Sequence, residues 1–293
     1  MLWFIWATCS ALLSALSAVV QKKILFRLNA LEFSFSVSLV IFFFTAFVPL
    51  FADVLSIPLS TVAVITVKSV LGASAFLLVM VSLQQNQISS ALPLLGITPA
   101  AAAILSLLFL GEALKESEWL GIGIMITGAY LLEKRPSSTL FQPLRRIVRS
   151  KTYYSIYGAV GLFALSSVLD RLLVYSMKTD LLNVLFYQHI VYLLFFSVIL
   201  MIRRFPLRAV VSKSGEEFPL IFTVAILTLA YRYTQLEATV LAPVALVLAV
   251  KRTSILYASL LGGKLFSEDR LPTKLLGAVL IVAAGFIILR NAG

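Results

Sequence analysis

The sequence predicts an all-α membrane protein with about ten transmembrane helices. The chain has 293 residues, of which 60% are hydrophobic and only 13% charged, and its mean hydropathy is +1.01. Globular chains are usually about half apolar and a quarter charged, so a soluble domain of this size would leave much apolar surface in water. The apolar residues also gather in stretches of about 20, the length that crosses a bilayer as a helix.

Ten apolar stretches, separated by turn-forming and charged residues, are the expected membrane spans. The first is expected to be a membrane helix, because it lacks the charged leading segment and the cleavage site of a signal peptide. One stretch, 134–152, is long and polar enough to be a linker between two halves. The expected spans are 2–21, 32–52, 59–83, 88–110, 118–133, 153–176, 182–202, 216–235, 238–262 and 272–290.

The two halves, 1–133 and 153–293, read as copies of one five-helix unit. SALSAVVQKKIL (14–25) aligns with FALSSVLDRLLV (163–174), which places Lys22 against Arg171. Residues 107–123 align with 264–279, and Pro93 corresponds to Pro243. Because each unit has an odd number of spans, the copies must enter the membrane in opposite senses, as an inverted repeat around a central cavity. The register slips between these blocks, so recurrence of small residues in membrane helices is the alternative explanation.

The stretch LGEALKESEWLGIGIMITGAYLL (110–132), together with the ten spans and the repeated unit, resembles the drug/metabolite transporter superfamily, most closely its EamA-like branch. The resemblance covers nearly the whole chain. It implies a small-molecule carrier or exporter with a central cavity, and it names no substrate.

A second, local likeness lies in residues 231–268, which resemble the corresponding region of sugar-phosphate/phosphate translocators. That family carries a Lys-Arg pair that binds phosphate, aided by tyrosines on the preceding helix. Lys251 and Arg252 match the pair, whereas Tyr231 and Tyr233 match more loosely. The rest of the chain departs from that family, so phosphate specificity is implied only for this region.

The two adjacent cations Lys251 and Arg252 also stand out without any family. Each is expected to cost about 2.5 to 3.5 kcal/mol at membrane depth. Helix neighbours point about 100° apart, so both need water, a counter-charge or an anionic ligand. A compact ammonium beside a planar guanidinium suits a phosphate or carboxylate.

Several further polar residues fall within the predicted spans. Lys68, Arg171 and Arg232 are candidate substrate contacts, although Arg171 could equally reach the membrane interface. Asp170 is expected to be a counter-ion or a coupling site, and His189 either a packed histidine or a proton relay. This surplus of cations favours an anionic substrate over cationic drugs.

Glu112 and Glu268 are expected to cap or tether helix ends. The chain has one cysteine and one histidine, so neither a disulfide framework nor a metal site is expected. No GxxxxGK[ST] motif appears, which excludes direct ATP drive, and no cofactor is expected. An intramembrane enzyme would need clustered catalytic groups that the sequence lacks. The net charge of +11 is attributed to basic loops and spans rather than to nucleic-acid binding.

These observations predict a secondary transporter that moves an anionic metabolite, phosphorylated or carboxylated, by alternating access. The alternatives are a flippase for a lipid-linked phosphate or sugar, and an exporter of amino acids or other metabolites. The expected partners are the substrate and the bilayer of a prokaryotic inner (plasma) membrane, with a homodimer left open. Basic loops favour termini outside and the linker in the cytoplasm, whereas the superfamily usually keeps both termini cytoplasmic.

Overall fold

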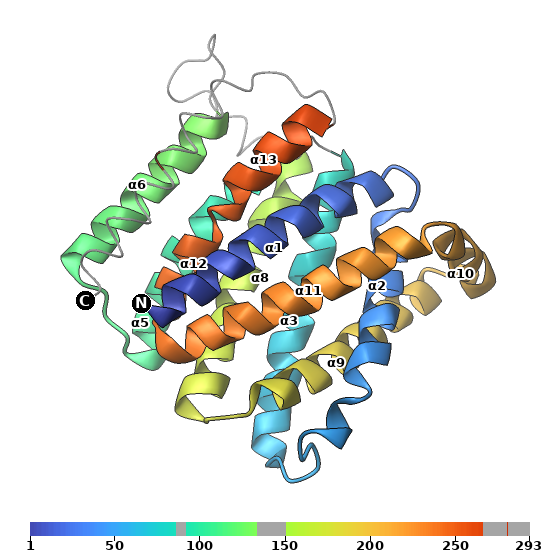
Figure 1. Ribbon diagram of the computed structural model, residues 1–293, viewed down its shortest axis with the longest axis horizontal. Coiled ribbons are helices and arrows are strands. Elements are labelled where there is room, and N and C mark those ends of the chain that lie inside the picture. The colour runs from blue at the N-terminus through green and yellow to red at the C-terminus, as the bar shows by residue number, and fades with distance from the viewer. Residues whose placement is uncertain (86–91, 134–150, 266–279, 281–293) are drawn as a thin grey trace.

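The computed structural model describes residues 1–85, 92–133, 151–265 and 280, and within these ranges the regular elements are all helical. Figure 1 shows long helices packed side by side. The elements are α1 (Leu2–Ile24), α2 (Ala30–Thr45), η1 (Val48–Leu50), α3 (Leu59–Gln85), η2 (Leu92–Ile97), α5 (Thr98–Leu110), α6 (Glu116–Glu133), α8 (Lys151–Arg171), η3 (Leu172–Ser176), α9 (Leu181–Ile202), α10 (Leu207–Glu216), α11 (Phe218–Leu241), α12 (Val244–Lys251) and α13 (Ser254–Leu265).

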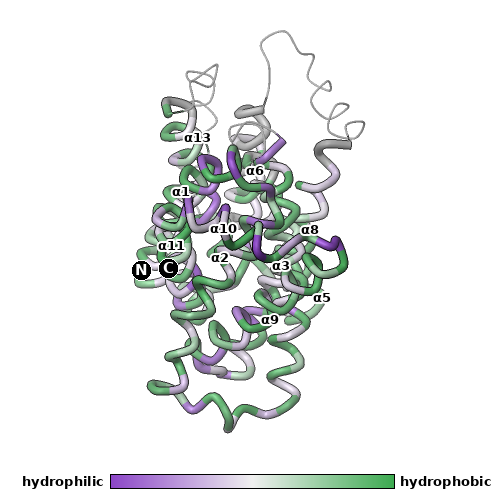
Figure 2. Tube along the Cα trace, turned by 90° about the vertical axis from the view of Figure 1, so that its right-hand side faces the viewer, coloured by the Kyte–Doolittle hydropathy of each residue, from purple (hydrophilic) through white to green (hydrophobic). Residues whose placement is uncertain are grey.

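Six helical segments in the described part are long and apolar enough to cross a bilayer. Apolar residues run along most of each helix (Figure 2), as lipid-facing helices require. The chain is therefore an integral multi-pass membrane protein. The predicted tenth span, 272–290, lies almost entirely outside the described residues, so ten spans stay a prediction. The six segments are Leu2–Ile24, Ala30–Leu50, Leu59–Gln85, Tyr154–Ser176, Leu181–Ile202 and Val244–Gly262.

The predicted boundary between the spans 216–235 and 238–262 was misplaced. Helix α11 continues to Leu241 and ends where Ala242 is extended, with φ −146° and ψ 156°. Pro243 causes this break, because proline lacks an N–H and keeps the preceding residue out of the helical region. The chain resumes as α12, directly after Pro243.

The predicted span 238–262 is also interrupted at its centre. Helix α12 ends at Lys251, and Arg252 and Thr253 form a turn before α13. The Thr253 amide donates to the carbonyl of Val250 at 3.0 Å, and its hydroxyl donates to the same oxygen at 2.8 Å. This tight i to i−3 pattern is 3₁₀-like. It places the two predicted anion-binding residues at the break.

The two halves of the chain interleave. Helix α1 packs along α11, and α3 packs along α8; Figure 1 shows α1 and α11 side by side. Helices α2 and α9 also pack together, α5 packs against α8, and both α12 and α13 pack against α1. Any space at the centre of the bundle is therefore bounded by both halves.

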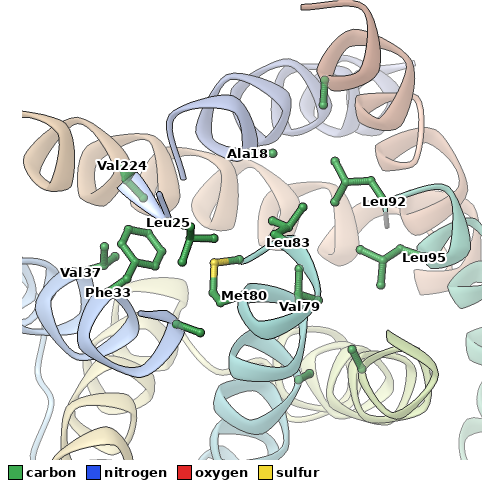
Figure 3. Close-up of a cluster of buried hydrophobic side chains, with 14 of the residues drawn as sticks. Ala18, Leu25, Phe33, Val37, Val79, Met80, Leu83, Leu92, Leu95 and Val224 are labelled. Carbon is green, nitrogen blue, oxygen red and sulfur yellow. The ribbon is translucent and has the colours of Figure 1, made fainter. Parts of the chain in front are cut away.

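A buried apolar cluster joins α1, α2, α3 and α11 at one end of this centre (Figure 3). Phe33 and Met80 are almost fully buried there, at 0% and 1% exposure. The N-terminus of α2 is fixed by a capping box, in which Asn29 and Glu32 each accept a backbone N–H of the other. These contacts hold one wall of the central space in place.

Candidate functional site

A cavity of about 140 Å³ lies at the centre of the bundle. Its wall is built by α1, α2, α3, η2, α8, α9, α11, α12 and Arg252, so both halves contribute. Part of the wall is apolar: Val79, Met80 and Leu83 of α3 and Leu92 and Leu95 of η2, all visible in Figure 3. The polar lining residues are Ser14, Gln21, Ser38, Ser166, Ser167, Asp170, Gln188, His189, Tyr192, Thr228, Tyr231, Arg232, Gln235, Lys251 and Arg252.

Three helices reach the cavity with polar side chains at the same spacing, i, i+1 and i+4. Residues at this spacing share one face of a helix, so an otherwise apolar helix presents a polar stripe inward. The three sets are Ser166, Ser167 and Asp170 on α8; Gln188, His189 and Tyr192 on α9; and Tyr231, Arg232 and Gln235 on α11.

Four of the buried polar residues form what we call the Asp170 cluster: Lys68, Asp170, Gln188 and Arg232. Lys68 Nζ lies 2.6 Å from Asp170 Oδ1 and donates to Gln188 Oε1 at 2.5 Å. Arg232 Nη2 lies 3.0 Å from Asp170 Oδ2 and donates to Gln188 Oε1 at 2.9 Å. The Asp170 carboxylate and the Gln188 amide oxygen each accept hydrogen bonds from both cations. Asp170 thus pairs with two cations, and its predicted role as a counter-ion or a coupling site stays a prediction.

Lys251 and Arg252, here called the Lys251 pair, line the same cavity without a carboxylate partner. Lys251 Nζ donates to Gln235 Oε1 and lies 4.5 Å from the centre of the Tyr231 ring. Arg252 Nε is buried without a hydrogen-bond partner. No ion pair among the described residues involves either side chain. A neutral amide and an aromatic face are weak compensation for a partly buried ammonium.

Arg171, predicted as a substrate contact, does not line this cavity. Its Nε forms an ion pair with Glu112 at 2.6 Å, and its Nη1 donates to the carbonyls of Thr239 at 2.5 Å and Val240 at 3.1 Å. The guanidinium also lies 3.6 Å from the Tyr175 ring centre. These contacts tie the ends of α5, α8 and α11 together. Glu112 is thus the expected helix tether, whereas Glu268 lies outside the described residues.

The other predicted site residues divide between the cavity wall and its surroundings. Tyr231 and Arg232 line the cavity, whereas Lys68 lies behind the wall at 1% exposure. Tyr233 points elsewhere and is 37% exposed. His189 lines the cavity and packs edge-on against Tyr192, with ring centres 5.5 Å apart. Its Nδ1 is buried without a hydrogen-bond partner.

Sequence reasoning missed the amide side chains that hold the cations. Gln188 and Gln235 accept hydrogen bonds from Lys68, Arg232 and Lys251. A glutamine inside an apolar span is itself a signal, because its amide must find a partner away from water. Within the part of the chain described here, no group of three or more His, Cys, Asp or Glu residues could hold a metal ion.

Comparison with known proteins agrees with this architecture. Residues 1–133 match the model of the EamA-like transporter family. One solved structure, described only as the crystal structure of a protein, matches over 95% of this chain and 96% of its own, with a TM-score of 0.63 and 14% sequence identity. At that identity it shows a shared fold alone. No curated protein matches the sequence.

The EamA match supports the predicted drug/metabolite transporter superfamily, whereas the likeness to sugar-phosphate translocators stays a prediction. The family match and the apolar helices together suggest a membrane transporter rather than an enzyme.

Proposed function

We propose that the chain is a secondary transporter that carries an anionic small metabolite, phosphorylated or carboxylated, through the central cavity. One observation carries the proposal: the Lys251 pair lines a buried cavity and has no carboxylate partner among the described residues. An unpaired cation at membrane depth costs about 2.5 to 3.5 kcal/mol. A bound anion would offset that cost.

The chemistry of the pair fits an anion with at least two oxygens. The guanidinium of Arg252 offers parallel N–H donors, and the ammonium of Lys251 adds a compact charge beside it. Tyr231 and Gln235 already contact Lys251 and would orient both the lysine and its ligand. Near the cavity, four cations, Lys68, Arg232, Lys251 and Arg252, face one described carboxylate, Asp170. A quaternary amine would meet repulsion there.

We further propose that the halves 1–133 and 153–293, joined by 134–152, are inverted repeats that alternate access to this cavity. The helix pairings support this: α1 packs on α11 as α3 packs on α8, and α2 packs on α9. The repeat-related cations also behave alike. Lys22 of α1 donates to the Leu83 carbonyl near the end of α3 at 2.5 Å, as Arg171 of α8 donates to carbonyls near the end of α11.

A counterflow assay in liposomes tests the function. Vesicles loaded with an unlabelled metabolite are assayed for uptake of the same labelled metabolite, across sugar phosphates, carboxylates, amino acids and organic amines. We expect uptake of one or more anions, with loss of uptake in Arg252→Gln. Lys23→Gln, at an exposed lysine that does not line the cavity, is the matched control. Uptake restricted to amines would overturn the proposal.

The same vesicles separate the carrier from the flippase. Leaflet exchange of a labelled polyprenyl phosphate, without uptake of water-soluble anions, would favour the flippase. The apolar wall formed by Val79, Leu83 and Leu92 beside the cations is the feature that makes this alternative worth testing.

A further inference from the structure

A short helix, α10, lies between the membrane-spanning helix α9 and the long helix α11, outside the cavity and its walls. The chain turns sharply after α9, where Arg204 is left-handed with φ 53°. Phe205 N donates to the Leu200 carbonyl and Arg204 N to the Met201 carbonyl, both at 3.0 Å. These bonds close the helix as a Schellman motif. Figure 1 shows α10 beyond the adjoining ends of α9 and α11.

One side of α10 is fixed to the bundle. Val210 is 1% exposed and packs in a cluster with Phe35, Phe196 and Leu200. The Ser214 and Ser36 hydroxyls lie 2.6 Å apart, so the helix is docked on α2 by polar as well as apolar contacts. Its orientation is therefore set, and the residues on its other sides are presented in a fixed arrangement.

The remaining surface of α10 combines exposed apolar and cationic side chains. Leu207 and Val211 are 49% and 56% exposed, and their spacing of four puts them on one side of the helix. Arg203, Arg204 and Arg208 are exposed as well, and none of them forms an ion pair within the described residues. In water, the apolar pair would be solvent-exposed and the three guanidinium groups would have no counter-charge within the described residues.

We propose that α10 and the turn before it bind the headgroups of anionic phospholipids in the adjoining leaflet. A short helix that directly follows a membrane span such as α9 lies near the membrane surface, where apolar side chains reach the acyl region. Guanidinium groups then meet phosphate oxygens, with which they form paired hydrogen bonds. We expect a net negative headgroup to be favoured over a zwitterionic one. Glu216 is the one exposed acidic residue in 203–216, so the positive amine of a zwitterionic headgroup would find few partners on this surface.

The proposal also orients the molecule. The same end of the bundle carries exposed Lys23 in the last turn of α1 and exposed Arg27 just after it, and Arg27 pairs with Glu217. Cytoplasmic loops are enriched in Lys and Arg, and the cytoplasmic leaflet is rich in anionic lipid. The end with α10 is then cytoplasmic, which matches the orientation that the positive-inside rule favours for this sequence.

Lipid titration of the purified full-length protein tests the surface. Phosphatidylglycerol or phosphatidylcholine is added to protein in neutral detergent, and bound lipids are counted by native mass spectrometry. Wild type should prefer phosphatidylglycerol. The preference should fall about fivefold in Arg208→Gln and about 25-fold in Arg203→Gln with Arg208→Gln, since each basic residue near the surface contributes a factor of about five. Arg204 is left in place to keep the turn.

Lys178→Gln is the matched control, because Lys178 is also exposed and precedes the start of α9, at the opposite end of that helix. Lipid preference unchanged in the double arginine variant, or reduced equally by Lys178→Gln, would overturn the proposal. Displacement of the lipid by soluble glycerol phosphate would overturn it too, since it would indicate a site for free phosphate. Lys251→Met should keep full lipid preference, so this test fails or succeeds independently of the proposed transport.

Discussion

The Asp170 cluster and the Lys251 pair are two groups of buried cations around one cavity, and they differ in what surrounds them. In the Asp170 cluster, Lys68 and Arg232 share a carboxylate and an amide oxygen, all within 3.0 Å. In the Lys251 pair, one cation has a neutral amide and an aromatic ring, and neither side chain forms an ion pair among the described residues. The first group thus has a carboxylate for its two cations, whereas the second has none.

This difference teaches that a mid-span charge is not in itself evidence of a binding site. Lys68 and Lys251 look alike in the sequence, since each lies within an apolar span. Lys68 is 1% exposed and bound to Asp170, so its role is to hold α3 to α8. Lys251 lines the cavity at a helix break. Discontinuous helices are where transporters bind substrates and ions.

The largest expected effect is on stability, in Asp170→Asn. This change leaves Lys68 and Arg232 buried without their shared carboxylate, and breaking a buried ion pair by removing one partner costs about 3 to 5 kcal/mol. Chemical denaturation in detergent should show a large loss in the free energy of unfolding. If Asp170→Asn has the same free energy of unfolding as wild type, the Asp170 cluster does not stabilise the fold.

Lys251→Met should have the opposite profile, with stability kept and transport impaired. Methionine fills a similar volume without a buried charge, so the free energy of unfolding should stay equal or rise. Hydrogen bonds to charged groups contribute about 1.5 to 3 kcal/mol. The apparent affinity for the transported anion should therefore fall at least tenfold in counterflow assays. If Lys251→Met is destabilised and its affinity for the anion is unchanged, the Lys251 pair would have the structural role that is assigned here to the Asp170 cluster.

A third expectation concerns the cavity wall beside the Asp170 cluster. A Cβ added at Gly72 would lie 2.4 Å from the Tyr192 hydroxyl oxygen and 3.4 Å from the carbon that bears it. Gly72→Ala should therefore displace Tyr192 and cost about 1 to 3 kcal/mol of stability. Tyr192→Phe removes the clashing oxygen, so the double variant should recover most of that loss. Thermal unfolding measures both; no recovery would show that the clash is not with this hydroxyl.

The smallest effect is expected at Tyr233. The sequence groups Tyr231 and Tyr233 together, but the structure places only Tyr231 in the cavity, with Tyr233 37% exposed. Tyr233→Phe should leave the affinity for the anion unchanged, whereas Tyr231→Leu should lower it, because it removes the ring beside Lys251. Equal losses in both variants would contradict the placement of the cavity on this face of α11.

Much of the architecture was predictable because lipid imposes long apolar helices, which composition and span length reveal directly. The all-helical fold follows from such signals, and so do the match to the EamA-like transporter family and the presence of Lys251, Arg252, Tyr231 and Arg232 on the cavity wall. The break after Lys251 was not predictable, since no proline follows it and the turn depends on local hydrogen bonds of Thr253.

Pairings between distant residues were the other part that the sequence could not supply. Arg171 and Glu112 are 59 positions apart, and Lys68 meets Asp170 across 102 positions. Nothing in the residue types says which carboxylate a buried cation will reach, because that depends on how helices from the two halves interleave. The sequence therefore identified the charges, but it did not reveal that Arg171 contacts helix ends outside the cavity lining.

The most direct test of the central claim is the melting temperature of the purified protein in the presence of matched anions and amines. Phosphorylated and carboxylated metabolites should raise the melting temperature of wild type and have no effect on Lys251→Met or Arg252→Gln. Lys23 is exposed and lies beyond the part of α1 that lines the cavity. Lys23→Met should therefore respond like wild type. Stabilisation by amines alone, or by anions equally in wild type and in Lys251→Met, would contradict the account.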